Sequence, residues 1–280
     1  MMKKFKSKTN TIFRIGLFIV IIMFLLALFS PILKPYDQNQ ADFYNVAKGI
    51  SGKHIFGTDS LGRDILSRVL EGGKTSIFMA IQIVSISFLI GTFLGVISGY
   101  MGGVVDGTIM TIVNILISYP NLIFALALIS VLGPSTQNAI IALCVVKWTR
   151  YARIARGEVL SLKNEIYIVA AKAIGNKRSR IMSNYIIPNI FSKLIVIATL
   201  DIGNTIMAYA SLSFLGMGVQ LPTPEWGSMI NEGREFMRTA PHISLFPGIF
   251  LIITVLGFQL LGDGLRDMLD PKMRENASKE

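Results

Sequence analysis

Long apolar runs constrain the fold of this chain more than any other feature of its sequence. Crossing the core of a bilayer takes about twenty apolar residues. Five runs of that length lie at residues 11–33, 75–100, 107–132, 189–215 and 243–262. A sixth, shorter run at 138–148 ends near Lys147 and Arg150. We count it as a span, because the basic segment after it would otherwise change sides of the membrane. The sequence therefore predicts an all-α, polytopic membrane protein with six transmembrane helices.

Composition agrees with a membrane protein. Of the 280 residues, 52% are hydrophobic and 16% are charged, whereas soluble domains are nearer one quarter charged. The net charge of +10 would suggest nucleic acid in a soluble chain, but Lys and Arg accumulate on the cytoplasmic side of membrane proteins. We therefore expect the lipid bilayer, and no nucleic acid, as a partner. The single cysteine, Cys144, excludes an internal disulfide and a cysteine-based zinc cluster.

The distribution of positive charge predicts the topology. Most of the 27 Lys and Arg residues fall in segments that lie on the side of the two termini, which predicts that both termini are cytoplasmic. Four basic residues precede the first run, as in a signal peptide. That run is long, however, and no Ala-x-Ala site follows it, so we favour a retained helix.

The predicted spans divide the chain into four parts: a tail with the first helix (1–35), an extracytoplasmic segment (36–74), a core of five spans (75–268) with a cytoplasmic loop at 150–188, and a tail (269–280). In the second part, Leu61, Ile65, Leu66 and Val69 recur at helical spacing. They predict an amphipathic helix at the outer interface, with a solvated surface helix as the alternative.

Polar residues and prolines inside the spans are candidates for a solute path. Asp201 is a carboxylate well inside a span, and such a group is expected to face protein or water. With Asn204 and Thr205 it either lines a path or forms a hydrogen bond between helices, and we favour the second. Pro120 and Pro247 each predict a kinked helix beside water or ordinary helix packing.

Two further patterns concern packing and nucleotides. The small residues Gly91, Gly95, Ser98 and Gly99 form a stripe that predicts a close contact between helices. Residues 73–75 read Gly-Lys-Thr like the end of a phosphate-binding loop, but Arg68 stands where that loop needs glycine. We expect no ATP hydrolysis by this chain, no catalytic residues, no cofactor and no metal.

The loop between the fourth and fifth spans predicts a docking element. Its first part, residues 158–174, reads as a helix, and Gly175 and Asn176 predict its end. Asn176 is expected to cap a second short helix over 177–187 that ends at Pro188. Ala170 and Ala171 permit close approach of another protein. Membrane topology is an alternative explanation for the positive charges of this loop, whereas a DNA-binding helix-turn-helix is disfavoured because spans flank the loop closely.

This loop resembles the cytoplasmic motif of ABC importer permeases, written Glu-Ala-Ala, three residues, Gly, nine residues, Ile-x-Leu-Pro. Ala170, Ala171, Gly175 and Pro188 match it at the right spacing, while Val169 replaces its Glu. Tyr185 and Ile187 replace its Ile and Leu.

Three more segments are similar to the dipeptide, oligopeptide and nickel permeases, and to the second ("C") permease of the pair in particular. They are His54–Asp59 with Leu61–Asp64, Ser67 and Arg68; Ser211–Gly218 with Pro222, Pro224 and Trp226–Ser228; and Leu261–Asp267 with Asp270 and Pro271.

The resemblance implies a six-helix permease of the type I ABC importer fold in a prokaryotic plasma membrane. It implies four partner chains: a second homologous permease, two cytoplasmic ATP-binding subunits and an extracytoplasmic solute-binding protein. The expected solutes are dipeptides or oligopeptides, with nickel or a metal–metallophore complex of the opine type as the alternative. An ion-coupled secondary transporter would carry several intramembrane charges and repeated halves. Asp201 alone does not meet that requirement.

Overall fold

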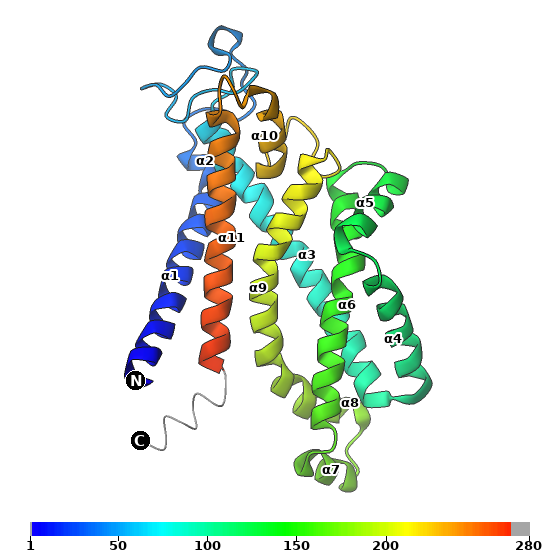
Figure 1. Cartoon of the computed structure of the whole chain (residues 1–280). Helices are drawn as coiled ribbons and strands as arrows, with labels where there is room; N and C mark the ends of the chain where they lie inside the picture. The colour runs from blue at the N-terminus through cyan, green and yellow to red at the C-terminus, as the bar shows by residue number, and fades with distance from the viewer. Residues whose placement is uncertain (1, 270–280) are drawn as a thin grey trace.

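The computed structural model describes the backbone of residues 2–269 and the side chains of residues 11–268. Five long helices run along the long axis of the molecule (Figure 1). They are α1 (Met2–Leu28), α3 (Ile65–Met101), α6 (Thr136–Leu162), α9 (Ile187–Phe214) and α11 (His242–Leu269). The start of α1, the end of α11 and the loop after α6 lie toward one end, and the segment after α1 lies at the other. The predicted tail from residue 270 onward, with Asp270 and Pro271, lies outside the described residues.

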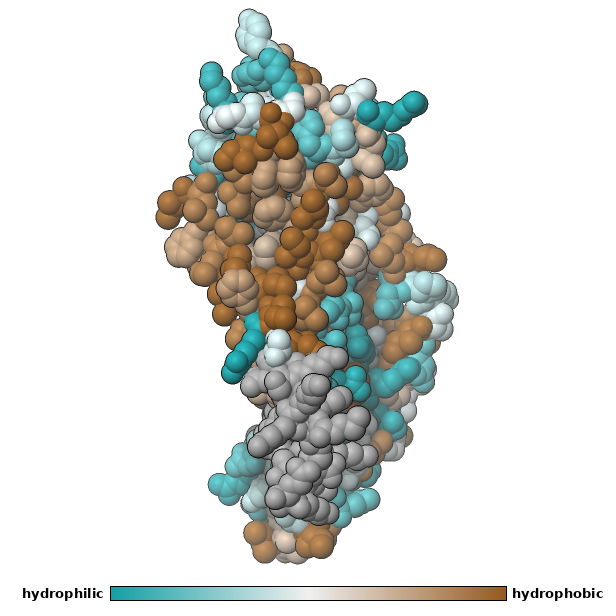
Figure 2. Space-filling view, turned by 60° about the vertical axis from the view of Figure 1, so that its left-hand side comes forward, coloured by the Kyte–Doolittle hydropathy of each residue, from teal (hydrophilic) through white to brown (hydrophobic). Residues whose placement is uncertain are grey.

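Shorter elements connect these helices. They are α2 (Ser30–Leu33), η1 (Phe43–Asn45), α4 (Gly103–Ile117), α5 (Asn121–Leu132), α7 (Ile166–Ala173), α8 (Arg178–Ile181), the π-helical turn η2 (Met182–Ile186), α10 (Trp226–Glu232) and η3 (Arg234–Phe236). Figure 2 shows a broad band of apolar residues on one face, below a hydrophilic cap. Such a band is the surface that a bilayer covers.

By length and apolar composition, four helical segments of the described chain qualify as membrane spans: Thr11–Leu28, Ile65–Met101, Arg178–Phe214 and His242–Met268. The pair α4 and α5 makes a fifth if it is counted as one broken span. The run predicted at 138–148 lies within α6, a helix of 27 residues. Charged side chains on α6 keep it out of this set, so the count of six spans stays a prediction.

The third predicted span is broken rather than merely kinked. Helix α4 ends at Ile117, α5 begins at Asn121, and the two axes differ by 91°. Pro120 occupies the position before α5. Proline has no backbone N–H to donate, and it disfavours the helical conformation of the residue before it. Both effects act at the place where the helix stops. Pro247, by contrast, lies inside the continuous helix α11.

The second span begins earlier than predicted. Instead of a separate interfacial helix, residues from Ile65 onward form the first turns of α3, with Ile65 and Val69 buried. Asp64 caps this helix, because its carboxylate accepts a hydrogen bond from the N–H of Ser67 at 2.8 Å. With 37 residues, α3 is about 55 Å long and therefore extends beyond a bilayer core of about 30 Å.

The stripe of small residues on α3 makes the predicted close contact, and its partner is α6. A Cβ atom on Gly91 would lie 2.3 Å from the carbonyl oxygen of Trp148, and one on Gly95 would lie 2.4 Å from that of Ala152. Real Cβ atoms do not approach backbone atoms so closely. Glycine at these positions therefore sets the distance between the two helices.

A buried ion-pair network holds the segment between α2 and α3 on the bundle. Arg63 pairs with Asp59 at 2.7 Å, and Arg68 pairs with Glu232 of α10 at 3.0 Å. Arg63 also reaches Glu232, and Arg68 also reaches Asp59 at 3.2 Å. The four charges thus satisfy one another where water is excluded. Next to them, the indole of Trp226 donates to the carbonyl oxygen of Val69 at 3.0 Å. The segments that carried two of the sequence motifs are therefore joined in space.

Candidate functional site

The predicted docking loop forms a compact projection at the end of the molecule that holds α7 (Figure 1). We call residues 163–181, which comprise α7, α8 and the turns around them, the knob. Helix α7 ends in two backbone hydrogen bonds, from the N–H of Gly175 to the carbonyl of Lys172 and from that of Asn176 to Ala171. This pattern is a Schellman motif, and it requires a left-handed residue at its turn. Gly175 supplies it with a φ of +82°.

Three details of the loop differ from the sequence prediction. The helix predicted over 158–174 is interrupted, because α6 ends at Leu162 and α7 begins at Ile166. Asn176 does not cap the next helix: Lys177 holds that position, and Asn176 instead closes the Schellman motif with its own N–H. Pro188 does not end a helix either, since it is the second residue of α9 and the helical segment Arg178–Phe214 continues across it.

A π-helical turn explains how α9 tolerates Pro188. Residues Met182–Ile186 form this turn, and the N–H of Ile187 donates to the carbonyl of Met182, five residues back. The wider turn precedes the residue that has no N–H to donate. The side-chain amide of Asn189 then donates to the carbonyl of Tyr185. The helix therefore continues from the knob into the membrane span without a break.

The knob is anchored in the bundle by its buried face. Ile168 and Ala171 of α7 are buried together with Ala155 and Val159 of α6 and Leu194 of α9. Ala171 is thus part of the chain's own core, whereas Ala170 is exposed. Close packing of this kind transmits displacement rather than absorbing it. A movement of the knob therefore moves the ends of α6 and α9 that pack against it.

The opposite face of the knob is apolar and open. Ile166, Val169 and Ile174 are exposed, and Ile174 has 78% of its surface accessible. On the side of the bundle, Lys172 of α7 lies over the ring of Tyr100, 5.6 Å from its centroid. Exposed aliphatic side chains flanked by charge, outside the spans, are typical of a protein-binding surface.

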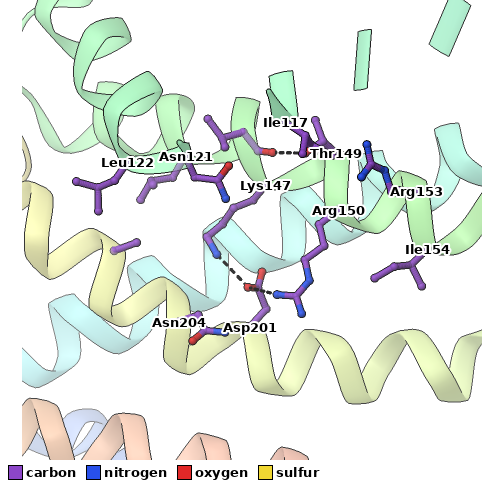
Figure 3. Close-up of a pocket in the computed structure, with 13 residues that line it drawn as sticks. Ile117, Asn121, Leu122, Lys147, Thr149, Arg150, Arg153, Ile154, Asp201 and Asn204 are labelled. Atoms are coloured by element: carbon purple, nitrogen blue, oxygen red, sulfur yellow. Dashed lines mark hydrogen bonds and ion pairs between the residues drawn. The ribbon is translucent and has the colours of Figure 1, made fainter. Parts of the chain in front are cut away.

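A second candidate site lies beside the middle of α9, where Asp201 lines it (Figure 3). It is a cavity of about 500 Å³ between α6, α9 and the break that separates α4 from α5. Its lining residues are Ile117, Asn121, Leu122, Leu143, Val146, Lys147, Thr149, Arg150, Arg153, Ile154, Asp201, Asn204 and Ala208. Pro120 is not among them, but the two residues that follow it are.

Asp201 carries the polar contacts of this cavity. Its Oδ1 accepts from the Lys147 ammonium at 3.0 Å and from the Arg150 guanidinium at 3.4 Å, and its Oδ2 accepts from the Tyr151 hydroxyl at 2.9 Å. Figure 3 shows both cations pointing toward it. Asp201 therefore bonds α9 to α6 and also lines a cavity. That a solute path passes beside it stays a prediction.

Asn204 and Thr205, the two polar residues predicted together with Asp201, differ in their exposure. Asn204 is exposed, lines the cavity and accepts a hydrogen bond from the Gln259 side chain of α11 at 3.0 Å. Thr205 is buried, and its hydroxyl donates to the carbonyl of Asp201. Thr205 thus belongs to the helix interior, while Asn204 is available to a solute.

Sequence reasoning missed the cationic side of the cavity. From the sequence, Lys147 and Arg150 mark only the end of a span, and no pattern there predicts a role for Arg153. The available signal was their spacing of three residues, which places them on one face of a helix. Among the described residues, no group of three or more His, Cys, Asp and Glu side chains is placed to hold a metal ion.

Comparison with known proteins identifies the family. Residues 91–275 match the family model of the inner membrane component of binding-protein-dependent transport systems. Residues 2–48 match the N-terminal transmembrane domain of oligopeptide transport permease C. The first match covers more than half of the chain. The chain belongs to the binding-protein-dependent transport permeases, and it is a membrane-integral transport protein rather than an enzyme.

Within this family, the chain is similar to permeases of dipeptide and glutathione transport systems. The dipeptide transport system permease protein DppC of Alkalihalophilus pseudofirmus is 42% identical over 267 residues, which cover 95% of this chain and 88% of the relative. The glutathione transport system permease protein GsiD of Escherichia coli O6:K15:H31 is 44% identical over 256 residues, or 91% and 84% of the two chains. GsiD of Pectobacterium atrosepticum is 41% identical over 260 residues, or 92% and 86%.

A solved structure shares the fold. An inward-facing structure of the MetNI methionine ABC transporter covers 70% of this chain and 95% of its own, with a TM-score of 0.52 and 20% identity. At that identity the likeness concerns the fold alone. It confirms the predicted class, a helical ABC importer permease fold.

Proposed function

We propose that this protein is the permease subunit of an ATP-driven importer for dipeptides, oligopeptides or glutathione-like peptides. It pairs with a second, homologous permease, and the solute path lies between the two. Two ATP-binding subunits dock on the knobs from the cytoplasm, and a solute-binding protein delivers the peptide from outside. Both termini then lie in the cytoplasm. The peptide class is supported by the dipeptide and glutathione permeases to which the chain is similar. None of these relatives is named for nickel or a metallophore.

The observation that carries this proposal is the two-faced construction of the knob. Its exposed apolar face, with Ile166, Val169 and Ile174, is suited to a soluble partner, while its buried face packs on α6 and α9. Those two helices also border the central cavity. A partner that grips the knob differently in two states therefore biases the shape of the cavity between two states.

The proposal predicts that Gly175→Asp abolishes peptide uptake and leaves the protein in the membrane. A side chain at a φ of +82° costs about 1–2 kcal/mol in an L-residue, and the new carboxylate would face the docking partner. Uptake of a labelled dipeptide should fall to background, and the ATP-binding subunit should no longer co-purify. Gly175→Ala, which adds strain without charge, should give an intermediate rate.

Gly157→Asp is the matched control. Gly157 is exposed on α6, has open space around its Cα and has a helical backbone, so that variant should transport. Uptake by Gly175→Asp at the wild-type rate, with the subunit still bound, would refute the docking role of the knob.

A protonophore distinguishes an ATP-driven importer from an ion-coupled secondary transporter. Uptake by a secondary transporter would stop when the proton gradient collapses, whereas ATP-driven uptake would continue.

A further inference from the structure

The central cavity carries more positive than negative charge. Lys147, Arg150 and Arg153 line it from one face of α6, and among the lining residues the one carboxylate is that of Asp201. Asp201 shares a single oxygen between Lys147 and Arg150 and gives its other oxygen to Tyr151. Its negative charge therefore offsets only one of the three cations.

The two arginines are the cations that remain available. The Arg150 side chain is 51% exposed, and its distance of 3.4 Å from Asp201 is long for a charge-assisted hydrogen bond. Arg153 donates to the neutral amide oxygen of Asn114 at 2.9 Å. One turn further along α6, Arg156 is held differently, because its Nε and Nη2 atoms each donate to one oxygen of the Asp106 carboxylate. Charge pairing is thus complete at Arg156 and incomplete at Arg150 and Arg153.

The excess of positive charge matters because of where the cavity lies. Asp201 lies midway along α9, level with the break between α4 and α5. A cation near the middle of a bilayer is unfavourable unless an anion or water compensates it. Guanidinium groups match the geometry of a carboxylate, because they offer parallel N–H donors. A carboxylate that enters the cavity would therefore be stabilised by groups already in place.

We propose that this cavity is a transient binding site for a carboxylate group of the transported peptide, with Arg150 and Arg153 as its ligands. It favours the passage of anionic peptides over cationic ones. This inference rests on the proposed function as a peptide permease. Asp201 and Lys147 act as positioning residues, because they fix the α6 face on which the arginines stand.

The first test measures the charge of the cavity without transport. In a Cys144→Ala background, Asn204→Cys places a thiol in the lining of the purified complex. Negatively and positively charged methanethiosulfonates are then compared. The ratio of their rates cancels the intrinsic reactivity of the thiol.

We expect the ratio of the negative-reagent rate to the positive-reagent rate to be about tenfold higher with both arginines present than in Arg150→Gln/Arg153→Gln, because two nearby positive charges attract the negative reagent. If the ratio is the same with and without the two arginines, the proposal is overturned. This would happen, for example, if an acidic residue of the second permease neutralised the arginines in the assembled complex.

The second test measures solute preference. Uptake of labelled Glu-Glu and Lys-Lys is compared in wild-type protein and in Arg150→Gln/Arg153→Gln, with the same binding protein, so that the preference of that protein cancels. Glu-Glu uptake should fall about tenfold relative to Lys-Lys uptake. Arg150→Lys/Arg153→Lys should retain most of the preference. Lys193→Gln is the control, because Lys193 pairs with Glu158 outside the cavity.

The outcomes separate the two proposals. An equal fall for both peptides, with wild-type uptake intact, overturns the carboxylate site and leaves the peptide permease standing. If the wild-type complex imports neither peptide and no other dipeptide, the proposed function fails instead, and the reagent ratio alone then decides whether the cavity is electropositive.

Discussion

At the scale of single residues, three ion pairs join charges that different helices carry. Asp201 on α9 joins Lys147 on α6, Arg156 on α6 joins Asp106 on α4, and Glu232 on α10 joins Arg68 on α3. Loss of one partner from a buried pair is more damaging than loss of both, because it leaves a charge without compensation.

The Asp201 pair tests that rule. Asp201→Asn should destabilise the protein by about 3–5 kcal/mol, since the Lys147 side chain is only 13% exposed and would keep its charge. The measurement is thermal unfolding of the purified complex. Asp201→Asn/Lys147→Met should recover most of the lost stability, because it removes both charges.

Asp263→Asn makes the same chemical change at an exposed position near the end of α11 and should leave the midpoint where it is. If Asp201→Asn unfolds at the wild-type temperature, the pair makes no net contribution to stability.

At the scale of helices, glycine decides how closely α3 and α6 approach. Gly91, Gly95 and Gly99 face α6 along three successive turns. Without a hydrophobic driving force between helices in lipid, such close contact is a main source of association. The contact also positions the cavity, because α6 carries its three cations.

The α3–α6 contact yields a prediction for one added methyl group. Gly95→Ala places a Cβ atom 2.4 Å from the carbonyl oxygen of Ala152 and 2.8 Å from the Cβ atom of Ala155, so the helices must separate. Overpacking of this kind costs about 1–3 kcal/mol, and the unfolding midpoint should fall. Gly107→Ala is the control, since its position on α4 is open and alanine favours a helix there. Equal midpoints for the two variants would contradict close packing at Gly95.

The helices also show how far sequence reasoning reaches. Apolar runs located the long helices well, because burial in lipid leaves a periodic and lengthy signal. Two of the failures concern prolines, and their outcomes are opposite. At Pro120 the helix breaks, whereas at Pro188 the helix continues after a π turn. Whether a proline breaks its helix depends on contacts with residues far away in the chain, and a local sequence pattern does not contain that information.

The same limit applies to the sites. The turn at Gly175 was predictable, because it needs only local backbone geometry. The arginines of the cavity were not assigned, because the role of Arg150 depends on Asp201, and Arg153 depends on Asn114 in another helix. The spacing of these residues was visible in the sequence, but the surface that they face was not.

At the scale of the whole molecule, one continuous path of packed residues connects the knob to the cavity. The knob packs on α6 and α9, and those helices are joined again at Asp201. The same two helices thus hold the knob at one end and the cavity midway. A force applied to the knob is therefore delivered to the residues that would contact the solute.

The central claim is that the knob faces the cytoplasm and is gripped there by an ATP-binding subunit. Its most direct test is labelling of Ile174→Cys in a Cys144→Ala background with a membrane-impermeant maleimide. The account predicts labelling in inside-out vesicles stripped of the ATP-binding subunit, protection when that subunit is restored, and no labelling in intact cells. Labelling of Ile174→Cys from outside intact cells would contradict it.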